Sequence, residues 1–201
     1  MPVQNLPDKY IIVEEPISGL VEYGTIPIHF EVRTVYDVQV PEHGLGGFVL
    51  VEREIETPWV KDYDAVKGEG PTSWAEKWDI SNWGILSVFV DDRRAGGCVI
   101  AYDTDGVNKL EGSKDIAALW DLRVHPELRG RGIGAALFTE AVAWTAERGC
   151  YCLKVETQNI NVPACRFYAK QGCVLGAINR FGYRDLPEEV ELVWYKAIQH
   201  Q

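Results

Sequence analysis

The residues best suited to chemistry form one short stretch of backbone between a predicted strand and a predicted helix: Arg129, Gly130, Arg131, Gly132, Ile133 and Gly134. Glycines at alternate positions lack Cβ atoms, so a ligand can approach the backbone closely. The start of a helix leaves about four N–H groups unpaired and carries roughly half a positive charge, which favours phosphate. Because Arg129 and Arg131 add further charge, the stretch predicts an anion-binding loop.

Two nucleotide-binding patterns compete for this loop. A Walker-type site needs Gly-Lys-Ser/Thr, and the stretch contains no such lysine. A dinucleotide fingerprint fits better, because Gly130, Gly132 and Ala135 match G-x-G-x-x-A and Glu156 lies about where a ribose carboxylate is expected. However, residues 125–129 separate the strand end from the first glycine, and repeated strand–helix–strand units are missing from the sequence. The dinucleotide pattern is therefore the weaker alternative.

The same stretch resembles the central motif, R/Q-x-x-G-x-G/A, of the GNAT superfamily of acetyl-CoA-dependent N-acetyltransferases, with Arg129, Gly132 and Gly134 at its defining positions. The resemblance implies that acetyl-CoA is the co-substrate and that the loop from Arg129 to Ala135 binds its pyrophosphate. It also implies that main-chain groups of Leu122 and Val124 bind the pantetheine arm. The implied fold is α/β (α+β): a mixed, mostly antiparallel central sheet with a central strand–helix–strand cofactor unit and flanking helices.

A second segment, residues 153–173, resembles the next GNAT motif, N-x-x-A-x-x-x-Y-x-x-x-G-F, through Asn161, Ala164, Tyr168 and Gly172. Cys173 stands where the family usually has Phe, a change that affects packing more than chemistry. Taken locally, Asn161 is a good helix N-cap, and Pro163 suits the first helical turn. By the resemblance, Asn161 belongs to the cofactor site, and Tyr168 lies near the coenzyme A sulfur as general acid toward the thiolate.

The general base is not marked by a motif. An alkylammonium has a pKa near 10, so a group or a water chain must remove its proton. Glu156, at the end of a predicted strand, is the first candidate, and Asp121, on the cofactor strand, is the second. Either carboxylate could instead face solvent or pair with Arg123 or Lys154. An amine that enters uncharged needs no single essential carboxylate.

Residues 57–83 form a polar, aromatic-rich connector in which Ser73 is expected to cap a short helix, with Glu76 at the capping-box position. Trp74 and Trp78 share a face, and they either cover the core or form a wall for a cationic acceptor. In the second case Asp62 and Asp64 would pair with the amine. The resemblance also places the loop after residue 178 near the acceptor, with three candidate contacts: Phe181, Tyr183 and Arg184.

Composition limits the class of protein. A chain of 201 residues, 46% hydrophobic and 25% charged, suits one globular domain. The net charge of −10 argues against a nucleic-acid partner, and it either attracts a cationic small molecule or serves only solubility. No run approaches the ~20 apolar residues of a membrane span, and the first residues do not resemble a secretory signal, so we expect a cytoplasmic location and no membrane partner. The odd number of cysteines, five, indicates reduced thiols, and no metal site is expected.

The remaining elements follow from alternation and turn residues. The helix after Gly134 should end near Gly149, and three early strands are expected at residues 10–13, 28–35 and 48–55. A hairpin pairs residues 85–90 with 97–102 around a turn at 91–94, and a closing hairpin pairs 173–178 with 190–197. We therefore expect one domain over 1–201, with a variable, β-rich acceptor-side region at 1–84 and an acetyl-CoA-binding core at 85–201.

Three functions follow. The first is N-acetylation of a primary amine of a small, cationic acceptor by direct attack on acetyl-CoA. The segment around residues 156–176 and the run Lys61–Asp64 resemble the streptothricin acetyltransferase group, which implies a streptothricin-like or aminoglycoside-like antibiotic and hence antibiotic resistance. The second is a protein or peptide N-acetyltransferase, and the third is a non-catalytic acyl-CoA-binding sensor. The resemblance also suggests a homodimer.

Overall fold

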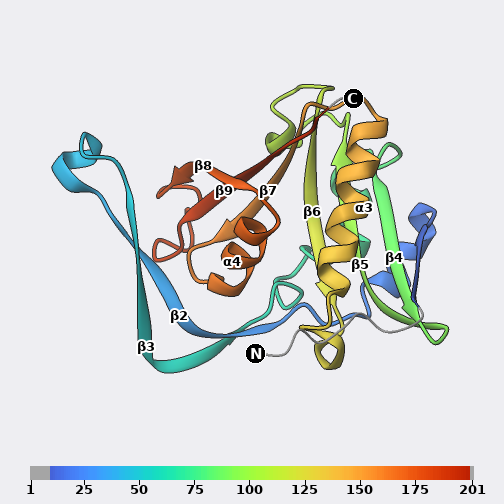
Figure 1. Ribbon diagram of the computed structural model, residues 1–201, viewed down its shortest axis with the longest axis horizontal. Coiled ribbons are helices and arrows are strands. Elements are labelled where there is room, and N and C mark those ends of the chain that lie inside the picture. Colours follow the sequence, from blue (N-terminus) through green and yellow to red (C-terminus); the bar gives the residue numbers. More distant parts are fainter. Residues whose placement is uncertain (1–9, 200–201) are drawn as a thin grey trace. The chain divides into compact units, whose positions relative to one another are not determined.

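The computed structural model describes residues 10–199, and these residues form two compact units (Figure 1). The first unit contains the described chain up to His29, then Asp62–Lys154, and the chain from Ala197 onward. The second unit contains Phe30–Lys61 and Val155–Lys196. The single domain expected from the sequence, with its division near residue 84, stays a prediction.

The first unit is built on four antiparallel strands in the order β1-β4-β5-β6. Its elements are β1 (Tyr10–Glu14), α1 (Leu20–Tyr23), α2 (Trp74–Lys77), β4 (Gly84–Val90), β5 (Arg93–Tyr102), β6 (Ile116–Val124) and α3 (Ile133–Glu147). The next strand in the sheet is β7 (Cys152–Gln158), which begins in the first unit and ends in the second. The sequence β6–α3–β7 is therefore the expected central cofactor unit, and the mostly antiparallel, mixed fold is confirmed.

Helix α3 covers β4, β5 and β6 on one face of the sheet (Figure 1). The predicted apolar face is the buried one and includes Leu137, Phe138 and Trp144. The helix ends as the sequence predicts, because Gly149 follows it with a φ of +72°, a left-handed conformation that glycine adopts without strain. The packed helix thus fixes where its own N-terminus lies relative to β6.

The hairpin of β4 and β5 is tighter than predicted. Asp91 and Asp92 both have positive φ, 48° and 59°, and they alone connect the strands. Two left-handed central residues give the type I′ geometry that matches the twist of the flanking strands, and aspartate tolerates it better than most residues. For this reason β5 begins at Arg93 rather than at residue 97.

The predicted helix in the connector is present, but its predicted capping is wrong. The Ser73 hydroxyl donates to the carbonyl oxygens of Gly70 and Gly68, at 2.7 and 2.6 Å, and does not cap α2. Trp74 is 3% exposed and packs with Trp83 and Trp78 into the buried cluster of this unit. Trp74 and Trp78 therefore cover the core, the first of the two interpretations that the sequence allows.

The second unit contains the hairpin of β2 (Phe30–Gln39) and β3 (Val49–Lys61), the helix α4 (Val162–Lys170), and β8 (Val174–Asn179) paired with β9 (Glu191–Ala197). Strand β9 lies between β7 and β8. The closing hairpin is confirmed. Strand β3 runs to Lys61, beyond the predicted end at residue 55, because pairing resumes after an irregularity that contains Pro58. Proline is tolerated at such a bulge.

Candidate active site

The glycine loop of the first unit is shaped for an anion. After a 3-10 turn at Pro126–Leu128, Gly130 and Gly132 adopt φ values of +78° and +86°. A side chain at either position would be strained, so both glycines are required by backbone conformation. Gly132 is the N-cap of α3, and no side chain caps the first amides of that helix. Arg131 is exposed beside them. Because these uncapped amides lie at the N-terminus of a long helix, they suit the phosphates of coenzyme A.

Arg129 serves the loop in a way that the sequence did not show. Its three nitrogen atoms each donate to a carbonyl oxygen: that of Val124 at 3.0 Å, of His29 at 2.9 Å and of Pro27 at 3.0 Å. Burial lowers the pKa of the guanidinium from its usual value. The side chain therefore fastens the loop to the end of β6 and to the segment before β2, while its charge remains at the loop.

A bulge in β6 sets which side chains face which way. Val99 pairs with Asp121 and Ile100 with Leu119, so Trp120 is the extra residue of β6. Its ring packs edge-on against Trp78, with centroids 5.0 Å apart. Beyond the bulge, side chains alternate again, so Asp121 and Arg123 share one face. Bulges of this kind often redirect side chains beside active sites.

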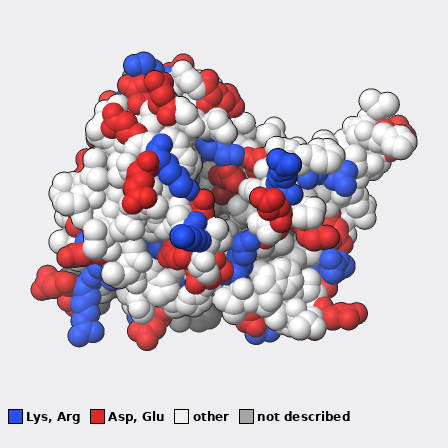
Figure 2. All heavy atoms as spheres, turned by 180° about the vertical axis from the view of Figure 1, so that it is seen from behind, with Lys and Arg blue, Asp and Glu red and all other residues white. Residues whose placement is uncertain are grey.

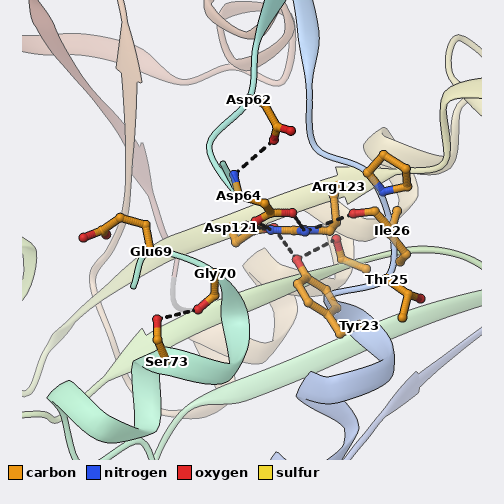
Figure 3. Close-up of polar contacts among 12 residues, drawn as sticks. Tyr23, Thr25, Ile26, Asp62, Asp64, Glu69, Gly70, Ser73, Asp121 and Arg123 are labelled. Carbon is orange, nitrogen blue, oxygen red and sulfur yellow. Dashed lines mark hydrogen bonds and ion pairs between the residues drawn. The ribbon is translucent and has the colours of Figure 1, made fainter. Parts of the chain in front are cut away.

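A buried polar network occupies the face of β6 that carries Asp121 and Arg123 (Figure 3). Arg123 donates from Nε to Asp121 Oδ1 at 3.0 Å and from Nη2 to Asp121 Oδ2 at 2.6 Å. It also binds both oxygens of Asp64, at 2.8 and 3.3 Å, and the carbonyl of Ile26 at 3.0 Å. The Tyr23 hydroxyl donates to Asp121 Oδ1, and the Tyr23 ring faces the guanidinium.

Within this network the guanidinium of Arg123 stays charged and the phenol of Tyr23 stays neutral. Burial of the Arg123 guanidinium opposes its charge, but hydrogen bonds and attraction to Asp121 outweigh burial and raise its pKa above the usual value. Burial, followed by the nearby charge of Asp121, raises the pKa of Tyr23 well above its usual value. Arg123 is therefore always a cation here, and Tyr23 always a donor.

Two sequence hypotheses change in the light of this network. Asp121, the second candidate base, already accepts from Arg123 with both oxygens and from Tyr23 with one. Asp64, suggested as a partner for the acceptor amine, forms an ion pair with Arg123, and its side chain is 29% exposed. The geometry thus favours a structural role for both carboxylates. Sequence could show the alternating charges on β6, but not the distant partners Tyr23 and Asp64.

In the second unit, α4 holds the residues of the second motif. The Asn161 side chain accepts from the amide of Ala164 at 3.1 Å, so the predicted N-cap is confirmed. Tyr168 is 7% exposed, and its ring packs edge-on against that of Phe167, with centroids 5.0 Å apart. Cys173, where the family usually has Phe, is buried at the end of the helix. The assignment of Asn161 and Tyr168 to the cofactor site stays a prediction.

Glu156, the first candidate base, lies half-buried on β7. One of its oxygens, Oε1, accepts a hydrogen bond from the hydroxyl of Tyr183, which lies in the loop between β8 and β9. Lys154, considered as a partner for Glu156, forms an ion pair with Glu111 at 2.6 Å. The structure therefore gives Glu156 an uncharged neighbour, Tyr183, that sequence reasoning had suggested only as an acceptor contact.

The profile of the acetyltransferase (GNAT) family matches residues 51–173, which includes the glycine loop and the second motif. The chain belongs to this family. It is 32% identical over 174 residues to a streptothricin acetyltransferase of Escherichia coli, covering 83% of this chain and 84% of the relative. Streptothricin acetyltransferase A of Bacillus subtilis (strain 168) is 26% identical over 163 residues, covering 80% of this chain and 86% of the relative.

Solved structures of the same kind share the fold. A crystal structure of a nourseothricin acetyltransferase has a TM-score of 0.73 and 24% identity, covering 94% of this chain and 99% of the other. A protein from Bacillus anthracis str. Ames, described as a streptothricin acetyltransferase and crystallised with acetyl coenzyme A, has a TM-score of 0.72 and 22% identity, covering 94% and 99%. The superfamily and fold expected from the sequence are thus confirmed.

The chain is accordingly an acetyl-CoA-dependent N-acetyltransferase, with acetyl-CoA as its co-substrate. Two further observations concern membrane-spanning helices and surface charge. Within residues 10–199, none of the helices combines the length and apolar character needed to cross a bilayer. Figure 2 shows acidic and basic side chains interspersed on the face turned away from the view of Figure 1. On that face, the excess negative charge is not gathered into one patch.

Proposed function

We propose that this enzyme transfers the acetyl group of acetyl-CoA to a primary amine of a small, cationic, streptothricin-like antibiotic by direct attack. The observation that carries the proposal is the likeness to the Escherichia coli streptothricin acetyltransferase, which extends over 83% of this chain. The net charge of −10 supports it, because an acidic protein attracts a cationic acceptor over long range. Such an activity would confer resistance to the antibiotic.

The first task of the site is to hold the co-substrate. The uncapped amides at the start of α3, with Gly130 and Gly132 in left-handed conformations, would bind the pyrophosphate. Main-chain groups of Leu122 and Val124 would bind the pantetheine arm. A backbone N–H on β6 would donate to the thioester oxygen, where a fixed donor stabilises developing negative charge without reorganisation.

The second task is proton transfer. Glu156 would accept the proton of the attacking amine, since it is a half-buried carboxylate on β7 that accepts a hydrogen bond from the neutral Tyr183. Asp121 is the less suitable base because Arg123 and Tyr23 already bind its oxygens. Tyr168, as general acid, would return a proton to the departing thiolate of coenzyme A.

The test measures thiol release from acetyl-CoA with a panel of amines that includes streptothricin, aminoglycosides and a peptide with a free N-terminus. Wild-type enzyme is compared with Glu156→Gln and Tyr168→Phe. The matched controls are Glu188→Gln, an exposed carboxylate, and Tyr36→Phe, a tyrosine outside the second motif. We expect fast release with streptothricin, and a loss of about 100-fold in kcat for Glu156→Gln with unchanged affinity for acetyl-CoA.

Each outcome has a separate meaning. Fast release only with the peptide would replace the antibiotic by a protein acceptor. Binding of acetyl-CoA, measured by titration calorimetry, without release on any amine would indicate a sensor. Wild-type turnover by Glu156→Gln across the pH range would remove that residue from the role of base.

A further inference from the structure

We infer that Tyr183 is a positioning residue that orients the carboxylate of Glu156 for proton transfer. This inference rests on the proposed role of Glu156 as general base. It assigns Tyr183 to the catalytic side of the site, whereas the sequence suggested a contact with the acceptor. Both side chains belong to the second unit.

The direction of the hydrogen bonds is fixed by Gln158. Its Nε2 donates to the Tyr183 hydroxyl oxygen at 2.9 Å, so this oxygen acts as acceptor toward Gln158. A phenol has one proton to donate, and here that proton points to Oε1 of Glu156. Because Glu156 and Gln158 are two residues apart on β7, their side chains share one face, and Tyr183 spans both.

The loop that carries Tyr183 is held at both of its ends. At the start, Asn179 accepts from the amide of Phe181 at 3.0 Å and donates to Glu191 at 3.0 Å. At the end, the Asn159 side chain accepts from the amide of Val190 at 2.7 Å, and Asn159 N–H donates to the Val190 carbonyl at 3.0 Å. The hydroxyl is therefore presented by a fixed support.

A further anchor lies beside the second end of the loop. Glu189 forms a hydrogen-bonded ion pair with Lys61, and both side chains are mostly buried, at 11% and 15% exposed. Gly182 adds a steric condition, because a Cβ at that position would lie 2.6 Å from Oε2 of Glu191. A side chain at position 182 would therefore displace the carboxylate of Glu191 on β9, which Asn179 also contacts.

Tyr183 stays a donor at any pH at which the enzyme works. Burial, followed by the charge and hydrogen bond of Glu156, raises its pKa far above the usual value, and Glu191 contributes in the same direction. The phenol is therefore not itself the base. What it supplies is a fixed hydrogen bond to one carboxylate oxygen, which sets the plane of the carboxylate and the direction from which it accepts a proton.

The experiment is a double-mutant cycle of Tyr183→Phe and Glu156→Gln, with Tyr36→Phe as the matched control. Loss of one hydrogen bond to a charged group predicts a fall of roughly 10-fold in kcat for Tyr183→Phe, with KM for acetyl-CoA unchanged. In the Glu156→Gln background, Tyr183→Phe should have little further effect.

Different results overturn the proposal in recognisable ways. An equal loss from Tyr183→Phe in both backgrounds, or a raised acceptor KM with unchanged kcat, would make Tyr183 an acceptor contact. Wild-type turnover by Glu156→Gln would instead show that the base itself is wrongly assigned. Thermal unfolding checks that the variants are folded. If Tyr183→Phe does not fold, Gln158→Leu tests the same network, and unchanged kcat in that variant counts against the proposal.

Discussion

Replacing Arg123 by Met tests the buried network on β6 most directly. The Arg123 side chain is 1% exposed and that of Asp121 is 6% exposed, so the substitution leaves a buried carboxylate without its cation. Removing one partner of a buried ion pair typically costs about 3–5 kcal/mol, and we expect a loss of that size. Tyr23 still donates to Asp121, which keeps the loss from being larger.

The effect of Asp121→Asn on the free energy of unfolding should have opposite signs in the wild type and in Arg123→Met. In the wild type, Asp121→Asn should lower the free energy of unfolding by about 1–3 kcal/mol, because it removes the hydrogen-bonded charge facing Arg123. In Arg123→Met, the same substitution should raise the free energy of unfolding, because it removes the uncompensated charge. Asp64→Asn is the milder control, since Asp64 is 29% exposed and water replaces part of what it loses.

Urea unfolding followed by tryptophan fluorescence provides the measurement, because four tryptophans pack in the cluster beside β6. The midpoints are compared at constant m, so that a shift reports stability alone. If Asp121→Asn destabilises both backgrounds equally, the two charges are not coupled, and the network described for this strand is not what stabilises it.

Two further predictions concern the ion pair of Glu15 with Arg94 in the first unit and the N-cap of α4. Glu15→Gln should lower the free energy of unfolding by about 1 kcal/mol at neutral pH. The Arg94 hydrogen bond lowers the pKa of Glu15 below its usual 4.5. The stabilisation by this carboxylate is therefore present above pH 4.5 and is lost as the pH falls through the lowered pKa. The urea midpoints of wild type and Glu15→Gln should differ at pH 7 and converge toward pH 3. Asn161→Ala should cost about 1 kcal/mol by removing the cap of α4, whereas Asn161→Ser should restore most of it, as thermal unfolding would show.

Local chemistry made much of the fold predictable. The glycine loop, α3 with its terminal Gly149 and α4 with its Asn161 cap depend on residues within one helical turn of each other, and the structure confirms these elements. Errors arose where a local signal was ambiguous. Pro58 is typical of a strand end, yet here it lies in an irregularity after which β3 resumes pairing.

The partners of the charged residues were not predictable. Arg123 lies 97 residues from the Ile26 carbonyl and 59 residues from Asp64, and Tyr183 lies 27 residues from Glu156. Backbone carbonyls occur at every residue and leave no signal in the sequence. The residue types were recognised as chemically important, but their roles depend on contacts that only folding creates.

The structure of β6 and of the glycine loop shows how two charged side chains beside the proposed co-substrate site are already used. Beyond the bulge at Trp120, the side chains of Asp121 and Arg123 are committed to the buried network, and Arg129 is committed to three carbonyls. In the site proposed above, binding of the co-substrate would therefore fall to the backbone of β6 and of the loop. Backbone amides keep their positions only if the chain that carries them is fixed, and the ion pairs of Arg123 and the hydrogen bonds of Arg129 supply that rigidity. A substitution at Arg123 should therefore weaken acetyl-CoA binding indirectly, through the strand, rather than through a lost contact to phosphate.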